Sequence, residues 1–89
     1  MITVGVDISK LKFDIFYQDQ SGKKISKVFE NNPTGFEALF NSLPDCNKIR
    51  IVMEATGNYG YDLATYCYQQ STVVYVVNPA QIKYYGQSK

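Results

Sequence analysis

The sequence of 89 residues contains no histidine and only two cysteines, Cys46 and Cys67. A structural zinc site of the usual kind needs four cysteine or histidine ligands, so none can be built from these residues. A cysteine protease is excluded as well, because neither thiol has a histidine to act as its base. We expect both thiols to be reduced in a cytoplasmic protein, since nothing else in the sequence is typical of secretion.

An excess of charge of one sign is also missing. Nine lysine and arginine residues balance eight aspartate and glutamate residues, which leaves a net charge of +1. A protein that binds duplex DNA on its own normally has a strongly basic face, and this balance argues against one. The hydrophobic share of 45% is typical of a globular chain and excludes a mostly disordered one.

Long hydrophobic runs are absent too. The longest, residues 73–77, is far shorter than the roughly 18 residues that suggest a membrane span. Asp7 interrupts the apolar N-terminus, so no signal peptide and no membrane partner are predicted. Aromatic residues, in contrast, are abundant: eight tyrosines and five phenylalanines provide a large surface to bury or to use.

Alternating apolar and polar residues predict three strands in the first third of the chain. In the first strand, Ile2, Val4 and Val6 share one face and Asp7 lies on the other. The tight turn at Ser9 predicts a hairpin to the second strand. The predicted strands, over residues 1–8, 13–18 and 24–30, form an antiparallel meander.

A helix is predicted next, with two possible starting points. Asn32 followed by Pro33 is typical of an N-cap and the first helical residue. Thr34 and Glu37 could instead form a capping box. Apolar residues then recur at helical spacing and predict a core stripe, which consists of Phe36, Leu39, Phe40 and Leu43.

Strand and helix patterns alternate over the rest of the chain. A strand over 48–54, a helix over 57–70, a strand over 72–77 and a helix over 80–89 are predicted. Tyr59 and Tyr66 fall on the core face of the second helix. The nearly continuous apolar run at 72–77 is typical of a central or doubly covered strand. The last helix has no stop signal before Lys89, so we expect the chain to end inside an element. The order predicts an α/β fold with a mixed sheet.

Two acids follow apolar strand residues, Asp7 in the first strand and Glu54 in the fourth. If these strands are parallel neighbours, both acids lie at the carboxyl edge of the sheet, where open α/β sheets bind ligands. Paired carboxylates suit Mg²⁺, and two such ions promote phosphoryl transfer. Alternatively, each acid merely ends its strand, with Asp7 bonding the following turn and Glu54 serving as an acid near the next helix cap.

Three further features could contact nucleic acid, but each has an alternative explanation. Lys10 and Lys12 could meet a phosphate backbone, or could be solvated charges. Lys83 stands beside two tyrosines in a basic and aromatic cluster, which the exposed end of a helix explains equally well. The glycine-containing turn at residues 56–60 could receive a phosphate on its amides, but it matches no known nucleotide motif and could be a plain turn.

Four motifs in order carry a resemblance to a known family. They are GVDISK at residues 5–10, NNPTGF at 31–36, MEATGNY at 53–59 and VVNPA at 76–80. Together they resemble the N-terminal domain of the insertion-sequence-110 family of transposases, which includes Piv-like DNA invertases. The resemblance covers essentially all 89 residues. It implies one RuvC-like, ribonuclease H-like domain over residues 1–89, truncated at its C-terminus.

The resemblance also implies a site and an activity. The family has an Asp-Glu-Asp-Asp tetrad that binds Mg²⁺ or Mn²⁺; Asp7 matches its first member and Glu54 its second. The last two acids lie beyond Lys89, and Asp62 is no substitute for them. Family members carry a nucleophilic serine in a second domain, and no serine here matches its motif. Some of them use an element-encoded guide RNA.

The implied function is DNA strand cleavage and transfer by the full-length protein, with this piece inactive alone. Because such recombinases act as oligomers, we expect a homo-oligomer. Two other functions stay open. One is a phosphotransferase of the sugar-kinase or actin-like class, which also opens with a hairpin that carries an acid after glycine. The other is a non-catalytic interaction module that uses the tyrosine-rich second helix as a subunit contact.

Overall fold

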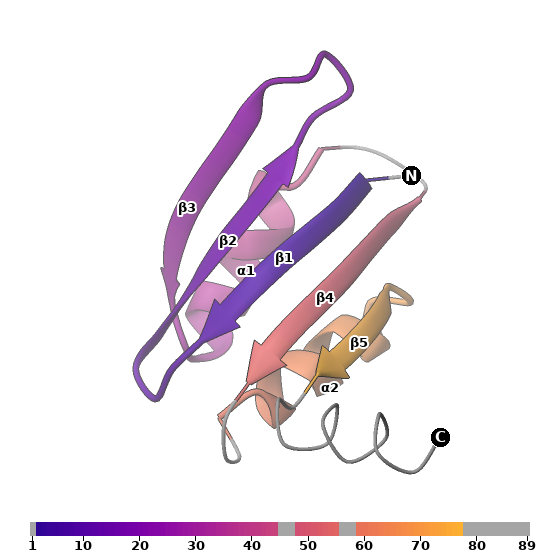
Figure 1. The fold of residues 1–89 in the computed structure, drawn as a ribbon. Coiled ribbons are helices and arrows are strands. Elements are labelled where there is room, and N and C mark those ends of the chain that lie inside the picture. The colour runs from indigo at the N-terminus through magenta and orange to yellow at the C-terminus, as the bar shows by residue number, and fades with distance from the viewer. Residues whose placement is uncertain (1, 45–47, 56–58, 78–89) are drawn as a thin grey trace, which may run out of the picture.

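A computed structural model describes residues 2–44, 48–55 and 59–77. Five strands form one mixed sheet in the order β3-β2-β1-β4-β5 (Figure 1). β2 pairs antiparallel with both β1 and β3, whereas β4 is parallel to β1 and β5 is parallel to β4. The strands are β1 (Ile2–Ile8), β2 (Lys12–Gln18), β3 (Lys24–Glu30), β4 (Ile49–Ala55) and β5 (Val73–Val77). The predicted meander and the mixed α/β sheet are confirmed.

Helix α1 (Pro33–Ser42) begins at the first of the two predicted starting points. The Asn32 side-chain oxygen accepts a hydrogen bond from the Gly35 backbone N–H at 2.9 Å, and Pro33 occupies the first turn. Gly35 lies so close to the end of β3 that a Cβ atom there would collide with the Glu30 carbonyl oxygen. The N-cap and this close approach together fix how the chain leaves β3 and enters α1.

Helix α2 (Tyr61–Gln69) is shorter than the sequence predicts. Tyr59 and Gly60 form a turn before it, and Gly60 is its N-cap residue. Tyr59 therefore lies outside the helix and is 45% exposed, so its predicted core position is wrong. Tyr66 is partly buried, as expected, and its ring packs against Phe36 and Phe40 of α1. A helical wheel shows which face a residue shares but not at which residue the helix begins.

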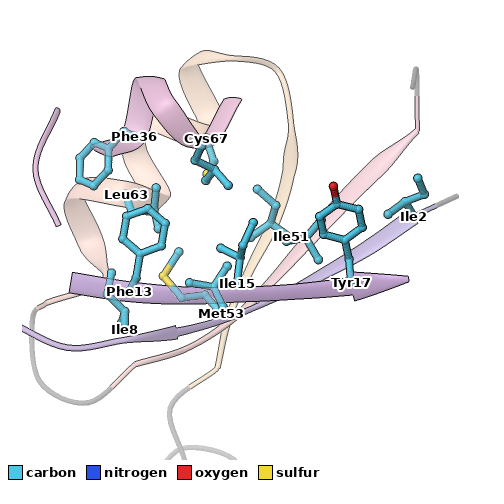
Figure 2. Packing of buried hydrophobic residues seen from close by; sticks show 13 residues of the cluster. Ile2, Ile8, Phe13, Ile15, Tyr17, Phe36, Ile51, Met53, Leu63 and Cys67 are labelled. Carbon is cyan, nitrogen blue, oxygen red and sulfur yellow. The ribbon is translucent and has the colours of Figure 1, made fainter. Parts of the chain in front are cut away.

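The core lies between one face of the sheet and the two helices, which both cover that face (Figure 1). Alternate residues of β1 are buried, as the sequence predicts. Side chains from the sheet and from the helices meet in one apolar cluster (Figure 2). Its buried members are Ile2, Val4, Val6, Ile8, Phe13, Ile15, Tyr17, Phe36, Leu39, Ile51, Met53, Leu63 and Cys67.

Strand β5 lies at an edge of the described sheet and pairs with β4 alone there, which corrects the prediction of a central or doubly covered strand. Val73, Tyr75 and Val76 are exposed. A continuous apolar run indicates that both faces of a strand are apolar, but it does not show how many strands pair with it.

The opposite face of the sheet is covered by neither α1 nor α2, and we call it the open face. Strand alternation places the polar side of β1 here, together with large apolar side chains that remain exposed. The strand residues on this face are Thr3, Gly5, Asp7, Lys12, Asp14, Phe16, Gln18, Lys24, Ser26, Val28, Glu30, Arg50, Val52, Glu54, Val73, Tyr75 and Val77. The two candidate acids therefore lie on a face without a helical cover in the described ranges.

Candidate metal centre

Asp7 and Glu54 are direct neighbours across two parallel strands. In the register of β1 and β4, Asp7 pairs with Glu54. Both side chains are exposed on the open face, at the carboxyl ends of their strands. Neighbouring strands lie roughly 4.8 Å apart, so two carboxylates that leave the same face at the same register lie side by side. The geometry on which the sequence argument depended is therefore present.

The acids line a cavity of about 330 Å³ whose other walls are largely apolar. The remaining lining residues are Gly5, Val6, Phe16, Val52 and Val77. Within the described ranges, neither the Asp7 side chain nor the Glu54 side chain has a hydrogen-bond or ion-pair partner. The turn after β1 is closed without Asp7, because the backbone N–H and the hydroxyl of Ser9 both donate to the Lys12 carbonyl at 2.9 Å. Both carboxylates are thus available to a ligand.

The chemistry of this donor set fits part of a site for a hard cation. Two carboxylates at one register repel each other, and a divalent cation bound between them would relieve that repulsion. Among the described residues, no group of three or more acidic, cysteine or histidine side chains is placed to hold a metal ion. Asp7 and Glu54 can therefore supply two ligands, and a complete site needs others.

A third acid, Asp14, lies in the same row, and the sequence analysis did not select it. It pairs with Asp7 in the antiparallel register of β1 and β2, and it is partly exposed. The alternation of β2, in which Phe13 is buried and Asp14 is not, could have placed it on the open face. Its position beside Asp7 depends on the register of the hairpin.

Asn31 connects the two loops that follow the acid-bearing strands. Its side-chain amide donates to the carbonyl of Ser9 at 2.9 Å and to that of Lys10 at 3.4 Å, both in the turn after β1. It also donates to the Tyr59 carbonyl at 3.1 Å, just before α2. Sequence reasoning noted Asn31 only as part of a motif, because these acceptors are distant in sequence. Asn31 holds together the segments around the acid pair.

The predicted lysine contacts are divided between described and undescribed parts of the chain. Lys10, in the turn after β1, and Lys12, at the start of β2, are exposed. Both lie at the edge of the sheet where the two acids lie. Lys83, most of the glycine-containing turn (residues 56–58) and the predicted last helix lie outside the described residues.

Comparison with solved structures defines the class of fold. RuvC of Thermus thermophilus in complex with a Holliday junction substrate has a TM-score of 0.53 and 12% sequence identity, over 93% of this chain and 69% of that one. A second Thermus thermophilus RuvC structure has a TM-score of 0.51 and 15% identity, over 93% and 65%. This chain thus spans about two thirds of the length of these proteins, and its fold is RuvC-like, of the ribonuclease H-like class.

The family follows from the sequence itself. The pattern of the insertion-sequence-110 type DEDD family, described as a transposase, matches residues 4–89. This chain belongs to that transposase family, as the four motifs predicted. No curated protein sequence matches it at a significant level. An Aquifex aeolicus Ppx/GppA phosphatase has a TM-score of 0.45 at 13% identity, over 89% of this chain and 36% of that one. In the part that the structure describes, neither helix is long and apolar enough to cross a bilayer.

Proposed function

We propose that this chain is the N-terminal catalytic domain, or most of it, of a DNA transposase that cleaves and transfers DNA strands with Mg²⁺ or Mn²⁺. The observation that supports this most is the pairing of Asp7 with Glu54 on the open face. Family membership and the RuvC-like fold agree with it. We further propose that residues 1–89 are one domain of a longer cytoplasmic protein and that the two remaining tetrad acids lie outside them. On this proposal the 89 residues alone do not cleave DNA.

In the proposed reaction, Asp7 and Glu54 would supply two of the ligands that hold the cation on the open face. When bound, such a cation lowers the pKa of an attacking group and stabilises the leaving oxygen of a phosphodiester. The apolar side chains of Phe16, Val52 and Val77 border the acids. Lys10 and Lys12, at the same edge, offset the negative charge of an approaching phosphate backbone.

The choice of DNA target belongs to parts of the full-length protein outside these residues. We propose that the protein acts as a homo-oligomer and that an element-encoded guide RNA takes part in target choice. Both proposals depend on the family resemblance. The net charge of +1 fits this arrangement, because most of the basic DNA-binding surface would then lie elsewhere in the protein.

Substitution of the two acids in the full-length transposase tests the proposal. A bound catalytic cation contributes several kcal/mol of transition-state stabilisation, and loss of a ligand weakens its binding. We therefore expect Asp7→Asn and Glu54→Gln each to reduce Mg²⁺-dependent strand cleavage about a hundredfold or more. The melting temperature should hardly change, since both side chains are exposed. The matched control is Asp62→Asn, which alters an exposed acid in the first turn of α2.

Cleavage at the wild-type rate by either acid variant would contradict the assignment, provided that the control is also active. The phosphotransferase alternative makes a different prediction, namely a rise in melting temperature on addition of ATP. The family match favours the transposase over that alternative.

A further inference from the structure

A phenylalanine ring on β2 lies over β1 beside the candidate metal centre. Phe16 pairs with Gly5 in the antiparallel register of β2 and β1, on the open face. A Cβ atom on Gly5 would lie 2.7 Å from Cζ and 2.9 Å from Cδ2 of Phe16, closer than real Cβ atoms come to other heavy atoms. The Phe16 ring therefore takes the place that a side chain at residue 5 would have. Glycine in a strand is typical of such a close approach.

The space over Gly5 is also the space next to Asp7. Residues two apart on a strand share a face and lie roughly 6.6 Å apart, and Asp7 follows Gly5 by two positions. The other neighbours of Asp7 on this face are Glu54 across β4 and Asp14 across β2. The Phe16 ring is therefore the apolar bulk that borders Asp7 on the side of the amino end of β1.

The Phe16 ring also stands between two hollows of the open face. The cavity of about 330 Å³ that contains the two acids, which we call the acid cavity, has Gly5, Phe16 and Val52 among its walls. The same three residues line a larger hollow of about 690 Å³, whose walls come mainly from β1, β2 and β3 and include neither acid. Since glycine adds no side chain, loss of the ring would join the two spaces above Gly5.

We propose that Phe16 is a positioning residue of the candidate metal centre, and that its ring over Gly5 confines the Asp7 carboxylate to the space that it shares with Glu54. The inference rests on the proposed function, because it takes Asp7 and Glu54 as ligands of the cation. The ring fills the space toward the amino end of β1, into which the Asp7 side chain could otherwise turn. The role of Gly5 is then to leave room for this ring.

Confinement of a carboxylate favours the binding of a cation. An exposed aspartate side chain loses rotational freedom when it becomes a ligand, and a side chain that is already restricted loses less. Phe16 does this from a separate strand and without touching the cation. We therefore expect its removal to weaken cation binding but not to abolish it, in contrast to removal of Asp7 itself.

Direct measurement of cation binding tests this role without DNA and without cleavage. Mn²⁺ is titrated into the full-length protein, and the free ion is followed by its electron paramagnetic resonance signal. Phe16→Ala removes the ring, so we expect about threefold to tenfold weaker Mn²⁺ binding. Phe16→Tyr keeps the ring and should bind Mn²⁺ as the wild type does. Tyr75→Ala is the matched control, because Tyr75 is a similarly exposed ring on the same face that does not line the acid cavity.

A substitution of Gly5 reaches the same space from β1. Gly5→Ala places a methyl group where the Phe16 ring lies, so the ring must move, and we expect Mn²⁺ binding to weaken as it does in Phe16→Ala. In the double variant Gly5→Ala and Phe16→Ala, the methyl group no longer meets a ring. The double variant should therefore lose no more affinity than Phe16→Ala alone, whereas independent effects would multiply.

Wild-type Mn²⁺ affinity in Phe16→Ala would overturn the proposal, whether or not its melting temperature falls, because the ring would then only support the strands. Equal weakening by Tyr75→Ala would overturn it as well, since the position of the ring over Gly5 would then not matter. The proposed function fails differently, namely if Asp7→Asn and Glu54→Gln both bind Mn²⁺ as the wild type does. The same titration therefore distinguishes the two failures.

Discussion

At the scale of single residues, Cys67 shows how burial changes chemistry. This free thiol lies on α2 and is fully buried against the sheet. Loss of hydration raises the pKa of the Cys67 thiol to about 12. Cys67 is a free thiol in the structure, while Cys46 lies outside the described residues. A buried thiol with so high a pKa is a poor nucleophile at neutral pH.

This pKa predicts how stability depends on pH. In the unfolded chain the Cys67 thiol ionises near its ordinary pKa of 9.0, whereas in the folded protein it stays protonated up to about pH 12. Unfolding between these values releases a proton, so the free energy of unfolding falls as pH rises above 9, by roughly 1.4 kcal/mol per pH unit. Below pH 9 the Cys67 thiol has no such effect.

Urea unfolding of the wild type and of Cys67→Ala at pH 8, 9 and 10 checks this prediction. Cys67→Ala should be less stable than the wild type at pH 8, and this difference should shrink above pH 9 because the variant lacks the loss that the thiol causes. Tyrosine and lysine ionisation is common to both proteins and cancels in the comparison. Equal pH dependence in the two proteins would show that the thiol titrates normally.

At the scale of elements, the structure depends on Asn31 to join the turn after β1 to the segment before α2. Asn31→Asp replaces the amide donor by a carboxylate that faces the carbonyl oxygens of Ser9 and Tyr59. We expect a loss of about 2–3 kcal/mol in the free energy of unfolding, since a charged group is left without a donor. Strand cleavage by the full-length protein should also fall.

Chemical denaturation measures the first effect and a cleavage assay the second. Asn41→Asp, on the exposed side of α1, makes the same chemical change without these carbonyl partners and should cost much less. If both variants were equally stable, the bonds of Asn31 would not hold these loops.

Local signals explain which elements could be predicted from the sequence. The start of α1 follows from Asn32 and Pro33 because capping involves only neighbouring residues. The alternation in β1 likewise placed Asp7 opposite the core side chains. The edge position of β5 could not be predicted, because pairing with β4 is a relation between distant segments. The bond of Arg50 to Thr3 was missed for the same reason, since these residues are 47 positions apart.

The candidate site could be predicted in part, because it combines local signals with contacts between distant segments. Each acid could be found from its position at the end of an apolar strand, and the resemblance to a family added a role for it. Their juxtaposition depended on the condition that β1 and β4 are parallel neighbours, which the register satisfies. Asp14 and Phe16 were not selected, because only the hairpin register places them beside Asp7 and Gly5.

At the scale of the whole molecule, exposed tyrosines on α2 support the proposed self-association. Tyr61 is 58% exposed and Tyr68 is 78% exposed. They are seven positions apart and so lie on one side of the helix. We expect the chain to form dimers or larger oligomers at high concentration, and we expect the double variant Tyr61→Ser and Tyr68→Ser to be monomeric.

Light scattering over a concentration series tests this expectation. Val28→Ser is the matched control, because it removes an exposed apolar side chain from the open face and should leave association unchanged. A wild-type chain that stays monomeric at the highest concentration would exclude a subunit contact through α2 in these 89 residues.

The central position of β1 also has a consequence for the order of events during synthesis. β1 can pair with β2 soon after both leave the ribosome, but its other neighbour, β4, comes much later in the chain. At roughly 5–20 residues per second, Glu54 is added about 2–9 s after Asp7. During that interval the nascent hairpin carries Asp7 beside Asp14 but lacks Glu54. The pair of Asp7 and Glu54 therefore forms only when β4 docks onto β1.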